Sequence, residues 1–165
     1  MADSFPIECQ TECFWCWAAV GVSVNRYFTP NSPLTQCELA THILPTHPPC
    51  CENPLPPNAD VSAHLQDVLS TLGALQGSPT SGPAAFADIR TQINESFPVC
   101  ARVAWPGQDL AHFVVICGFA VSSSGEPWLD IADPFFPNST VPYNEFAQAY
   151  QGSGIWTDTF LVKQP

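Results

Sequence analysis

Basic side chains are scarce in this chain of 165 residues. It has four lysines and arginines in total against 15 acidic residues, which gives a formal net charge of −11. A phosphate backbone or an anionic membrane surface would repel so acidic a protein. We therefore expect neither a nucleic-acid partner nor a membrane partner.

Long apolar runs are lacking as well. No stretch approaches the roughly 18 consecutive apolar residues of a membrane-spanning helix. Residues 1–6 contain neither the basic region nor the apolar region of a signal peptide. We therefore expect either a protein made without a leader or one whose leader was trimmed.

Cysteine, in contrast, is abundant, with eight residues. Cys16 shares the N-terminal third with five others, which are the disulfide candidates: Cys9, Cys13, Cys37, Cys50 and Cys51. This cluster indicates one or two disulfides, whose pairing the sequence does not determine, and a secreted or exported protein, with a cytoplasmic location still open. Zinc binding by the same cysteines is the competing interpretation, but the cluster contains one CxxC pair where closed zinc sites usually have two.

The remaining composition and patterning indicate an α+β fold. A hydrophobic content of 45% is typical of a folded chain, and the length fits a single domain over residues 1–165, which we expect to be monomeric. Helical spacing and start or stop signals predict helices over residues 18–28, 34–44, 61–72 and 83–94, with Asp60 as the N-cap of the third. The segments predicted as strands are 98–105, 111–119, 128–133 and 155–162, with a short helix over 143–150.

This order places helices first and antiparallel strands afterwards. We therefore expect a helical half over about residues 1–96 that packs across a cleft on a β half over about residues 97–165. Residues 45–57 form a proline-rich loop that would need an anchor, which a disulfide could supply.

The first predicted helix follows a short polar segment that contains Cys16. This cysteine falls at the first turn of the helix, where unpaired backbone N–H groups meet the positive end of the helix dipole. Both favour the thiolate, which is the nucleophilic form of cysteine. Gln10, six residues upstream, has a side-chain amide that can donate to an oxyanion. The segment therefore predicts a nucleophile together with its oxyanion donor.

A cysteine nucleophile needs a base and a third group that orients the base. His112 opens the most apolar strand directly after a polar turn, so we expect its ring at a strand edge that faces the cleft. The other histidines lie where a surface or capping role suffices: His42, His47 and His64. Asp130 and Asp133 point to opposite faces of the next strand. Pleat geometry favours Asp133, at the end of the strand, as the orienting acid.

The order Gln10, Cys16-Trp17, His112, Asp133 resembles that of papain-like cysteine peptidases. It is most similar to the bacterial branch typified by the AvrRpt2-like and C39-like peptidases. Further motifs carry the resemblance along nearly the whole chain: Gln36-Cys37-Glu38-Leu39-Ala40, Cys50-Cys51, His112-Phe113-Val114-Val115-Ile116 and Asp133-Pro134. The resemblance implies a papain-like fold, no metal or other cofactor, and a peptide or protein substrate cleaved through a thioester acyl-enzyme.

The resemblance also implies a role for each residue. Cys16 would attack the carbonyl carbon, and His112 would pair with the thiolate and then protonate the leaving amine. Asp133 would fix the imidazole tautomer, while the Gln10 side chain and the Cys16 backbone N–H would bind the oxyanion. Cys13 is similar to the papain cysteine that forms a disulfide near the nucleophile, which implies pairing with Cys50 or Cys51.

Three alternatives remain beside the endopeptidase. An amidase or acyltransferase, for example one acting on cell-wall peptides, would use the same triad, because a fold is a poor guide to substrate. A non-enzymatic module stabilised by disulfides or zinc would need the cysteines alone. A redox role for Cys13-x2-Cys16 ranks lowest because the segment lacks a strand before the helix and would leave His112 without a role.

Overall fold

The structure is a computed structural model that describes residues 5–165. In this part of the chain the helices are α1 (Cys16–Phe28), α2 (Gln36–Ile43), α3 (Leu65–Thr71), α4 (Phe86–Asn94) and α5 (Tyr143–Ala149). The strands are β1 (Thr80–Ser81), β2 (Val99–Ala104), β3 (Ala111–Val121), β4 (Pro127–Ala132), β5 (Ser139–Pro142) and β6 (Ile155–Leu161). The α+β class is therefore confirmed, and none of these helices is both long and apolar enough to cross a membrane.

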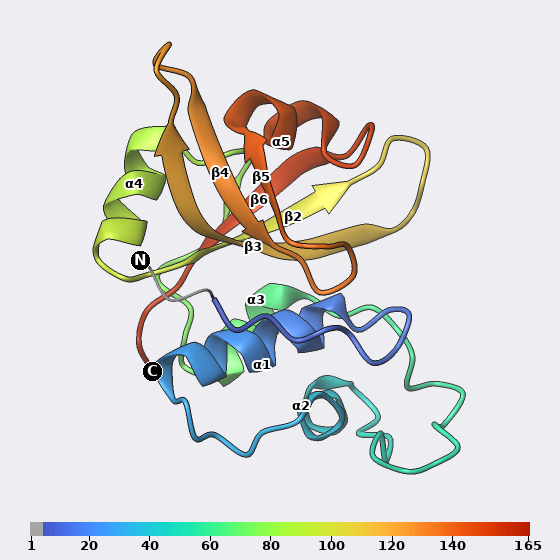
Figure 1. The fold of residues 1–165 in the computed structure, drawn as a ribbon. Helices are drawn as coiled ribbons and strands as arrows, with labels where there is room; N and C mark the ends of the chain where they lie inside the picture. Colours follow the sequence, from blue (N-terminus) through green and yellow to red (C-terminus); the bar gives the residue numbers. More distant parts are fainter. Residues whose placement is uncertain (1–4) are drawn as a thin grey trace.

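The strands form one antiparallel sheet in the order β1-β6-β2-β3-β4-β5 (Figure 1). Helices α1, α2 and α3 lie below the sheet in this view. The central strands are apolar on both faces: in β2, Cys100 packs in the core shared with α1–α3, while Val99 and Ala101 pack in a second core with α4 and α5. Burial on both faces explains why β3 appears in the sequence as a nearly continuous apolar run.

The helical layer that packs on the sheet ends earlier in the chain than the expected boundary near residue 96. α4 contacts β2 and β3, and β1 pairs with β6, so both belong with the sheet. Among the helices of residues 5–165, α1, α2 and α3 form the layer on the opposite side, and α3, the last of them, ends at Thr71. The strands β1 and β5 were not predicted, and they lie at the two edges of the sheet.

Helix α1 is the centre of the helical layer. Its residues from Cys16 to Val24 are all buried, and α2, α3 and β3 contact it. Gly21 lets α1 approach its neighbours closely, because a Cβ at this position would lie 2.5 Å from Val68 Cγ1 of α3 and 3.0 Å from Leu39 Cδ2 of α2. This packing fixes the direction of α1 and therefore the position of Cys16 at its N-terminus.

Helix α3 is shorter than predicted, and Asp60 is not its N-cap. α3 begins at Leu65 after His64, four residues later than expected. The Asp60 carboxylate instead accepts a hydrogen bond from the Phe14 N–H at 2.8 Å. A carboxylate can cap a helix or hold a distant backbone N–H, and here the segment before α1 provides the donor.

The disulfide joins Cys37 to Cys51, so the pairing of Cys13 with Cys50 or Cys51 was wrong. The Cα atoms of Cys37 and Cys51 are 5.0 Å apart, within the range that a disulfide spans. Cys9 and Cys13 are free and exposed, and Cys50 is free and buried in the core. The proline-rich loop is therefore anchored to α2, and not to the helix that carries Cys16.

Removing this disulfide is expected to lower the free energy of unfolding by about 3 kcal/mol, since it closes a loop of roughly 15 residues. The double variant Cys37→Ser, Cys51→Ser should show the loss in urea denaturation under oxidising conditions. Cys13→Ser is the matched control and should change the free energy of unfolding by less than about 0.5 kcal/mol. Equal losses in the two proteins would contradict the pairing.

Candidate active site

Cys16 is the first residue of α1. Trp15, at the N-cap position, makes no side-chain capping hydrogen bond, so no such cap occupies the N–H groups of the first turn. Cys16 is 6% exposed, and its thiol lines a cleft that also contains His112. The cysteine therefore lies where the sequence predicted, at a helix N-terminus, and it is largely buried in the wall of the cleft.

The segment around Cys16 is held by residues 59–61. The Trp15 indole donates to the Ala59 carbonyl oxygen at 2.8 Å, and the Trp17 indole donates to the Val61 carbonyl oxygen at 3.0 Å. Together with the bond from the Phe14 N–H to Asp60, these contacts fix both neighbours of Cys16. They position the thiol without a disulfide to Cys13.

The sheet brings His112 and Asp133 together. His112 is the second residue of β3, and Asp133 directly follows β4, which pairs antiparallel with β3 through Val115 and Ala132. The His112 Nε2 and Asp133 Oδ1 atoms are 2.7 Å apart. The Cys16 side chain lines the same cleft as the imidazole and lies close enough to it to influence its pKa. A thiol, an imidazole and a carboxylate are thus brought together at one cleft, with the imidazole bonded to the carboxylate.

The Asp133 carboxylate is fully buried and accepts several hydrogen bonds. Its Oδ1 atom receives the backbone N–H groups of Phe135 and Phe136 at 2.8 and 2.9 Å in addition to the His112 ring. Its Oδ2 atom receives the Tyr150 hydroxyl at 2.7 Å. Burial alone would raise the pKa of Asp133, but the hydrogen bond and positive charge of His112, with the other donors, hold this pKa below its usual range.

His112 is held in its charged form. Burial alone would lower the pKa of the imidazole, but the hydrogen bond and negative charge of Asp133, together with the nearby Cys16 side chain, raise it to about 9. Three aromatic rings surround the imidazole, those of Trp105, Phe135 and Phe136, with ring centroids 6.1 to 6.4 Å from it. At neutral pH the ring is therefore an imidazolium that can stabilise a thiolate.

Gln10 lies in the same cleft, but its amide already has partners. Its Nε2 atom donates to the carbonyl oxygens of Glu12 and Cys13 at 2.9 and 2.7 Å, and its backbone N–H donates to the Pro134 oxygen. The Oε1 atom is buried without a hydrogen-bond partner. Gln10 thus connects the segment before Cys16 to the turn after Asp133, and its predicted oxyanion role stays a prediction.

The cleft has a volume of about 340 Å³. Besides Gln10, Cys16 and His112, its lining is mostly apolar and aromatic: Phe14, Trp105, Leu110, Ala111, Phe135 and Phe136. The exposed fractions of Phe14, Leu110 and Phe135 are 38%, 50% and 67%, which is unusual for side chains of this kind. An apolar surface thus surrounds the reactive groups.

The sequence of residues 2–151 matches the model of a protein family described as papain-like cysteine protease AvrRpt2. The chain belongs to this family. It is therefore a papain-like cysteine peptidase, a hydrolase whose substrate is a protein, as the sequence resemblance implied. No curated protein matches the chain. The additional resemblance to C39-like peptidases stays a prediction.

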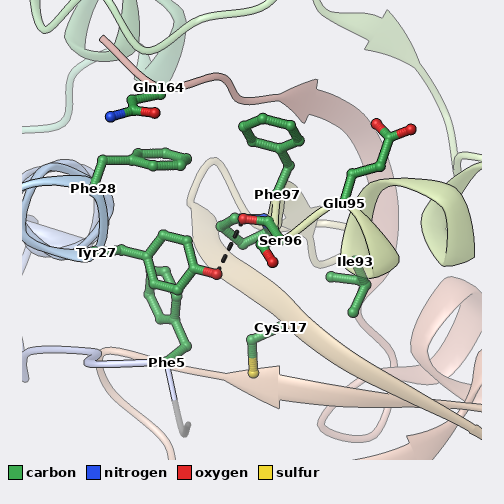
Figure 2. Close-up of a pocket in the computed structure, with 10 residues that line it drawn as sticks. Phe5, Tyr27, Phe28, Ile93, Glu95, Ser96, Phe97, Cys117 and Gln164 are labelled. Carbon is green, nitrogen blue, oxygen red and sulfur yellow. Dashed lines mark hydrogen bonds between the residues drawn. The ribbon is translucent and has the colours of Figure 1, made fainter. Parts of the chain in front are cut away.

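The peptidase has a second, larger cavity at the opposite end of α1, with a volume of about 570 Å³ (Figure 2). Phe28 and Phe97 lie on either side of it with ring centroids 6.0 Å apart, and the Tyr27 hydroxyl donates to the Ser96 oxygen. Its thiol, Cys117, is a poor nucleophile because burial, together with the charge of Asp130, raises its pKa to about 11. The lining contains no histidine, so this cavity offers no imidazole base beside its thiol.

The remaining candidates of the sequence lie away from the reactive groups of the peptidase. Asp130 accepts a hydrogen bond from the Thr140 hydroxyl at 2.6 Å on the neighbouring strand. His42, His47 and His64 line other cavities. Within residues 5–165 no group of three or more His, Cys, Asp or Glu side chains is arranged to hold a metal ion, which leaves the zinc alternative without a ligand set there.

Sequence reasoning missed three contributions to the site. Asp60 holds the segment before Cys16, Tyr150 contacts the acid, and Phe135 and Phe136 supply both N–H donors and rings. The pair of aromatic residues directly after Asp133-Pro134 was a usable signal, because exposed aromatic residues beside a candidate acid indicate a cleft wall. Tyr150 gave no local signal, since it is 17 residues from its partner.

Proposed function

We propose that the peptidase is an endopeptidase in which Cys16 is the nucleophile, His112 the acid and base, and Asp133 the residue that orients His112. The observation that carries this proposal is the imidazole of His112, which is hydrogen-bonded to Asp133 Oδ1 at 2.7 Å and lines the same cleft as Cys16 at the start of α1. A nucleophile, a base within hydrogen-bond reach and a third group behind the base are what nucleophilic catalysis requires.

The reaction steps then follow from the roles of these three residues. The Cys16 thiolate attacks the carbonyl carbon of the scissile amide, and the developing oxyanion is stabilised by backbone N–H groups at the start of α1. The C–N bond breaks as His112 donates its proton to the leaving amine, which leaves a thioester on Cys16. Water attacks the thioester while neutral His112 accepts the proton of that water. The C–S bond breaks, a carboxylic acid product leaves and then loses its proton to solvent, and the thiolate–imidazolium pair returns.

Gln10 would contribute to the oxyanion site once its amide turns from one of its two carbonyl partners. It lines the same cleft as Cys16, six residues upstream of it. Its buried Oε1 atom has no hydrogen bond, so the orientation seen is not one in which all of its polar atoms are satisfied. A bound substrate whose oxyanion attracts Nε2 would offset the loss of one carbonyl contact.

The cleft wall suggests the substrate. Phe14, Leu110 and Phe135 present large apolar surfaces to solvent next to the reactive groups. No Asp, Glu, Lys or Arg side chain is part of the lining. A substrate with bulky apolar residues next to the scissile bond would cover these side chains and gain from burying apolar area.

An oxidising compartment also fits this peptidase. The Cys37–Cys51 disulfide closes the loop that begins after α2, and such bonds persist in secreted and exported proteins. We therefore propose that the protein acts outside the reducing cytoplasm, on an exposed or unfolded segment of another protein.

Cleavage-site profiling with a peptide library tests the proposed function, with Cys16→Ala as the inactive control. We expect cleavage at internal peptide bonds with a bulky apolar residue nearby, and no cleavage by the control. Hydrolysis of cell-wall peptides alone, with no internal cleavage of library peptides, would instead favour the amidase alternative. Equal cleavage by the wild type and by Cys16→Ala would refute the role of Cys16.

A further inference from the structure

The second oxygen of the proposed catalytic acid has a dedicated partner. Asp133 Oδ1 receives three donors: the His112 ring and the backbone N–H groups of Phe135 and Phe136. Asp133 Oδ2 receives the Tyr150 hydroxyl at 2.7 Å, which is its one hydrogen bond from the residues that the structure describes. Tyr150 comes from the end of α5, and so it connects a separate part of the chain to the acid.

Tyr150 is held firmly enough to orient another group. It is 2% exposed, and its ring packs edge-to-face on that of Phe146, with an interplanar angle of 70° and centroids 5.1 Å apart. Its backbone exchanges two hydrogen bonds with Gly154, at 2.9 and 2.8 Å, across a tight turn. The hydroxyl therefore has little freedom to move away from Asp133.

The direction of this hydrogen bond is fixed by protonation. Burial raises the pKa of Tyr150, and the charge of Asp133 and the hydrogen bond to it raise this pKa further. The hydroxyl thus remains protonated and always donates, while the carboxylate always accepts. A donor of this kind favours the ionised form of Asp133.

We propose that Tyr150 is a positioning residue for the reaction: its hydroxyl fixes the plane of the Asp133 carboxylate and keeps it ionised, so that Oδ1 stays directed at His112. This inference rests on the proposed function of Cys16, His112 and Asp133. Without the hydroxyl, Oδ2 would be buried with no donor, and the carboxylate would be favoured to rotate and exchange its oxygens between the available donors. The imidazole would then lose its single orientation toward Cys16.

Tyr150→Phe is the direct test, because it removes the hydroxyl and keeps the ring that packs on Phe146. We expect kcat to fall roughly tenfold with an unchanged KM, because Tyr150 is buried and is not part of the cleft lining that a substrate would contact. The midpoint of the Asp133 carboxyl titration, followed by carbon NMR, should move up by about one pH unit because a donor to the charged form is lost.

Tyr143→Phe is the matched control on the same helix. The Tyr143 hydroxyl donates to the Ala84 carbonyl oxygen at 2.9 Å and has no bond to Asp133. Melting temperatures of both variants report how much stability each hydroxyl supplies. The control should keep the kcat and the Asp133 titration of the wild type even if its melting temperature falls.

Two results would overturn the inference. One is an Asp133 titration in Tyr150→Phe that coincides with that of the wild type. The other is a fall in kcat of the same size in Tyr143→Phe, because stability alone would then explain it. Failure of the proposed function would be distinguishable from failure of this inference. If Cys16→Ala retains wild-type activity, the proposed triad is wrong. The Asp133 carboxyl titration in Tyr150→Phe would still decide whether the Tyr150 hydroxyl keeps Asp133 ionised.

Discussion

Alanine in place of His112 is expected to lower kcat/KM for a peptide substrate by at least about 10⁴-fold. In the proposed reaction, the variant lacks the proton donor to the leaving amine and the positive charge that would stabilise the thiolate of Cys16. His112 is only partly exposed and its ring makes a hydrogen bond to Asp133, so a melting curve must confirm that the variant is folded. His42→Ala is the matched control, because His42 is exposed and should be replaceable without loss of activity.

The role of His112 can also be tested without a substrate, by comparing thiol labelling of the wild type and His112→Ala. In the wild type, iodoacetamide should modify Cys16 before Cys9 and Cys13, although Cys16 is buried and the other two are exposed. Accessibility alone predicts the reverse order, so faster labelling of Cys16 would show that its sulfur is activated. In His112→Ala, Cys16 should become the slowest of the three, which peptide mass spectrometry can measure. Labelling of Cys16 that is no faster than that of Cys13 in the wild type would contradict the activation argument.

Replacement of Asp133 is the second change with a large expected effect. Asp133→Ala should lower kcat/KM by about 10³-fold, because His112 loses its partner and its fixed orientation. It also leaves the backbone N–H groups of Phe135 and Phe136 and the Tyr150 hydroxyl without an acceptor, so some loss of stability is expected as well.

Asp133→Asn separates the charge from the geometry. The amide oxygen can accept the same three hydrogen bonds as Oδ1, and the amide nitrogen can donate to the Tyr150 oxygen, so the shape of the site is retained. The negative charge is lost, and the pKa of His112 should fall from about 9 toward its usual value. Because the hydrogen bonds that orient His112 are retained, activity at neutral pH should fall less in Asp133→Asn than in Asp133→Ala.

The sign of the pH dependence follows from these pKa values. His112 is charged below a pKa of about 9, so kcat/KM of the wild type should decline as the pH rises through about 9. The pKa of Asp133 is lowered, so the pair is lost at the acid end only when this carboxylate becomes protonated. The His112–Asp133 ion pair should also stabilise the fold at pH values between the pKa of Asp133 and that of His112. This stabilisation is lost as the pH rises through the pKa of His112. In Asp133→Asn the alkaline decline should begin at lower pH; an unchanged profile would exclude Asp133 as the partner of His112.

Several elements of the site were predictable because their signals are local. Cys16 follows a polar segment and precedes a long apolar run, so its place at a helix N-terminus could be inferred from neighbouring residues. The apolar run after His112 identified β3, and the pleat of the next strand favoured Asp133 over Asp130. Strand alternation depends on a period of two residues, and such a period is visible in the sequence.

The features that the sequence did not predict depend on residues that are far apart in the chain. Cys37, Cys50 and Cys51 are chemically equivalent in the sequence, and only the packing of the proline-rich loop on α2 brings Cys51 within reach of Cys37. Asp60 is a residue type that commonly caps helix N-termini, but its carboxylate instead accepts a hydrogen bond from the backbone N–H of Phe14, 46 residues away. The edge strands β1 and β5 have two and four residues, too few for a periodic pattern to appear.

The sequence by itself determined the α+β class, the helix that begins at Cys16, and the set of a thiol, an imidazole and a carboxylate that this peptidase carries. The tertiary structure alone decided the disulfide partner, the contacts of Asp60 and the link from Tyr150 to Asp133. The reason is physical: helical and strand periods are properties of adjacent residues, whereas the partner of a buried polar group depends on which distant donor the packed chain brings within about 3 Å.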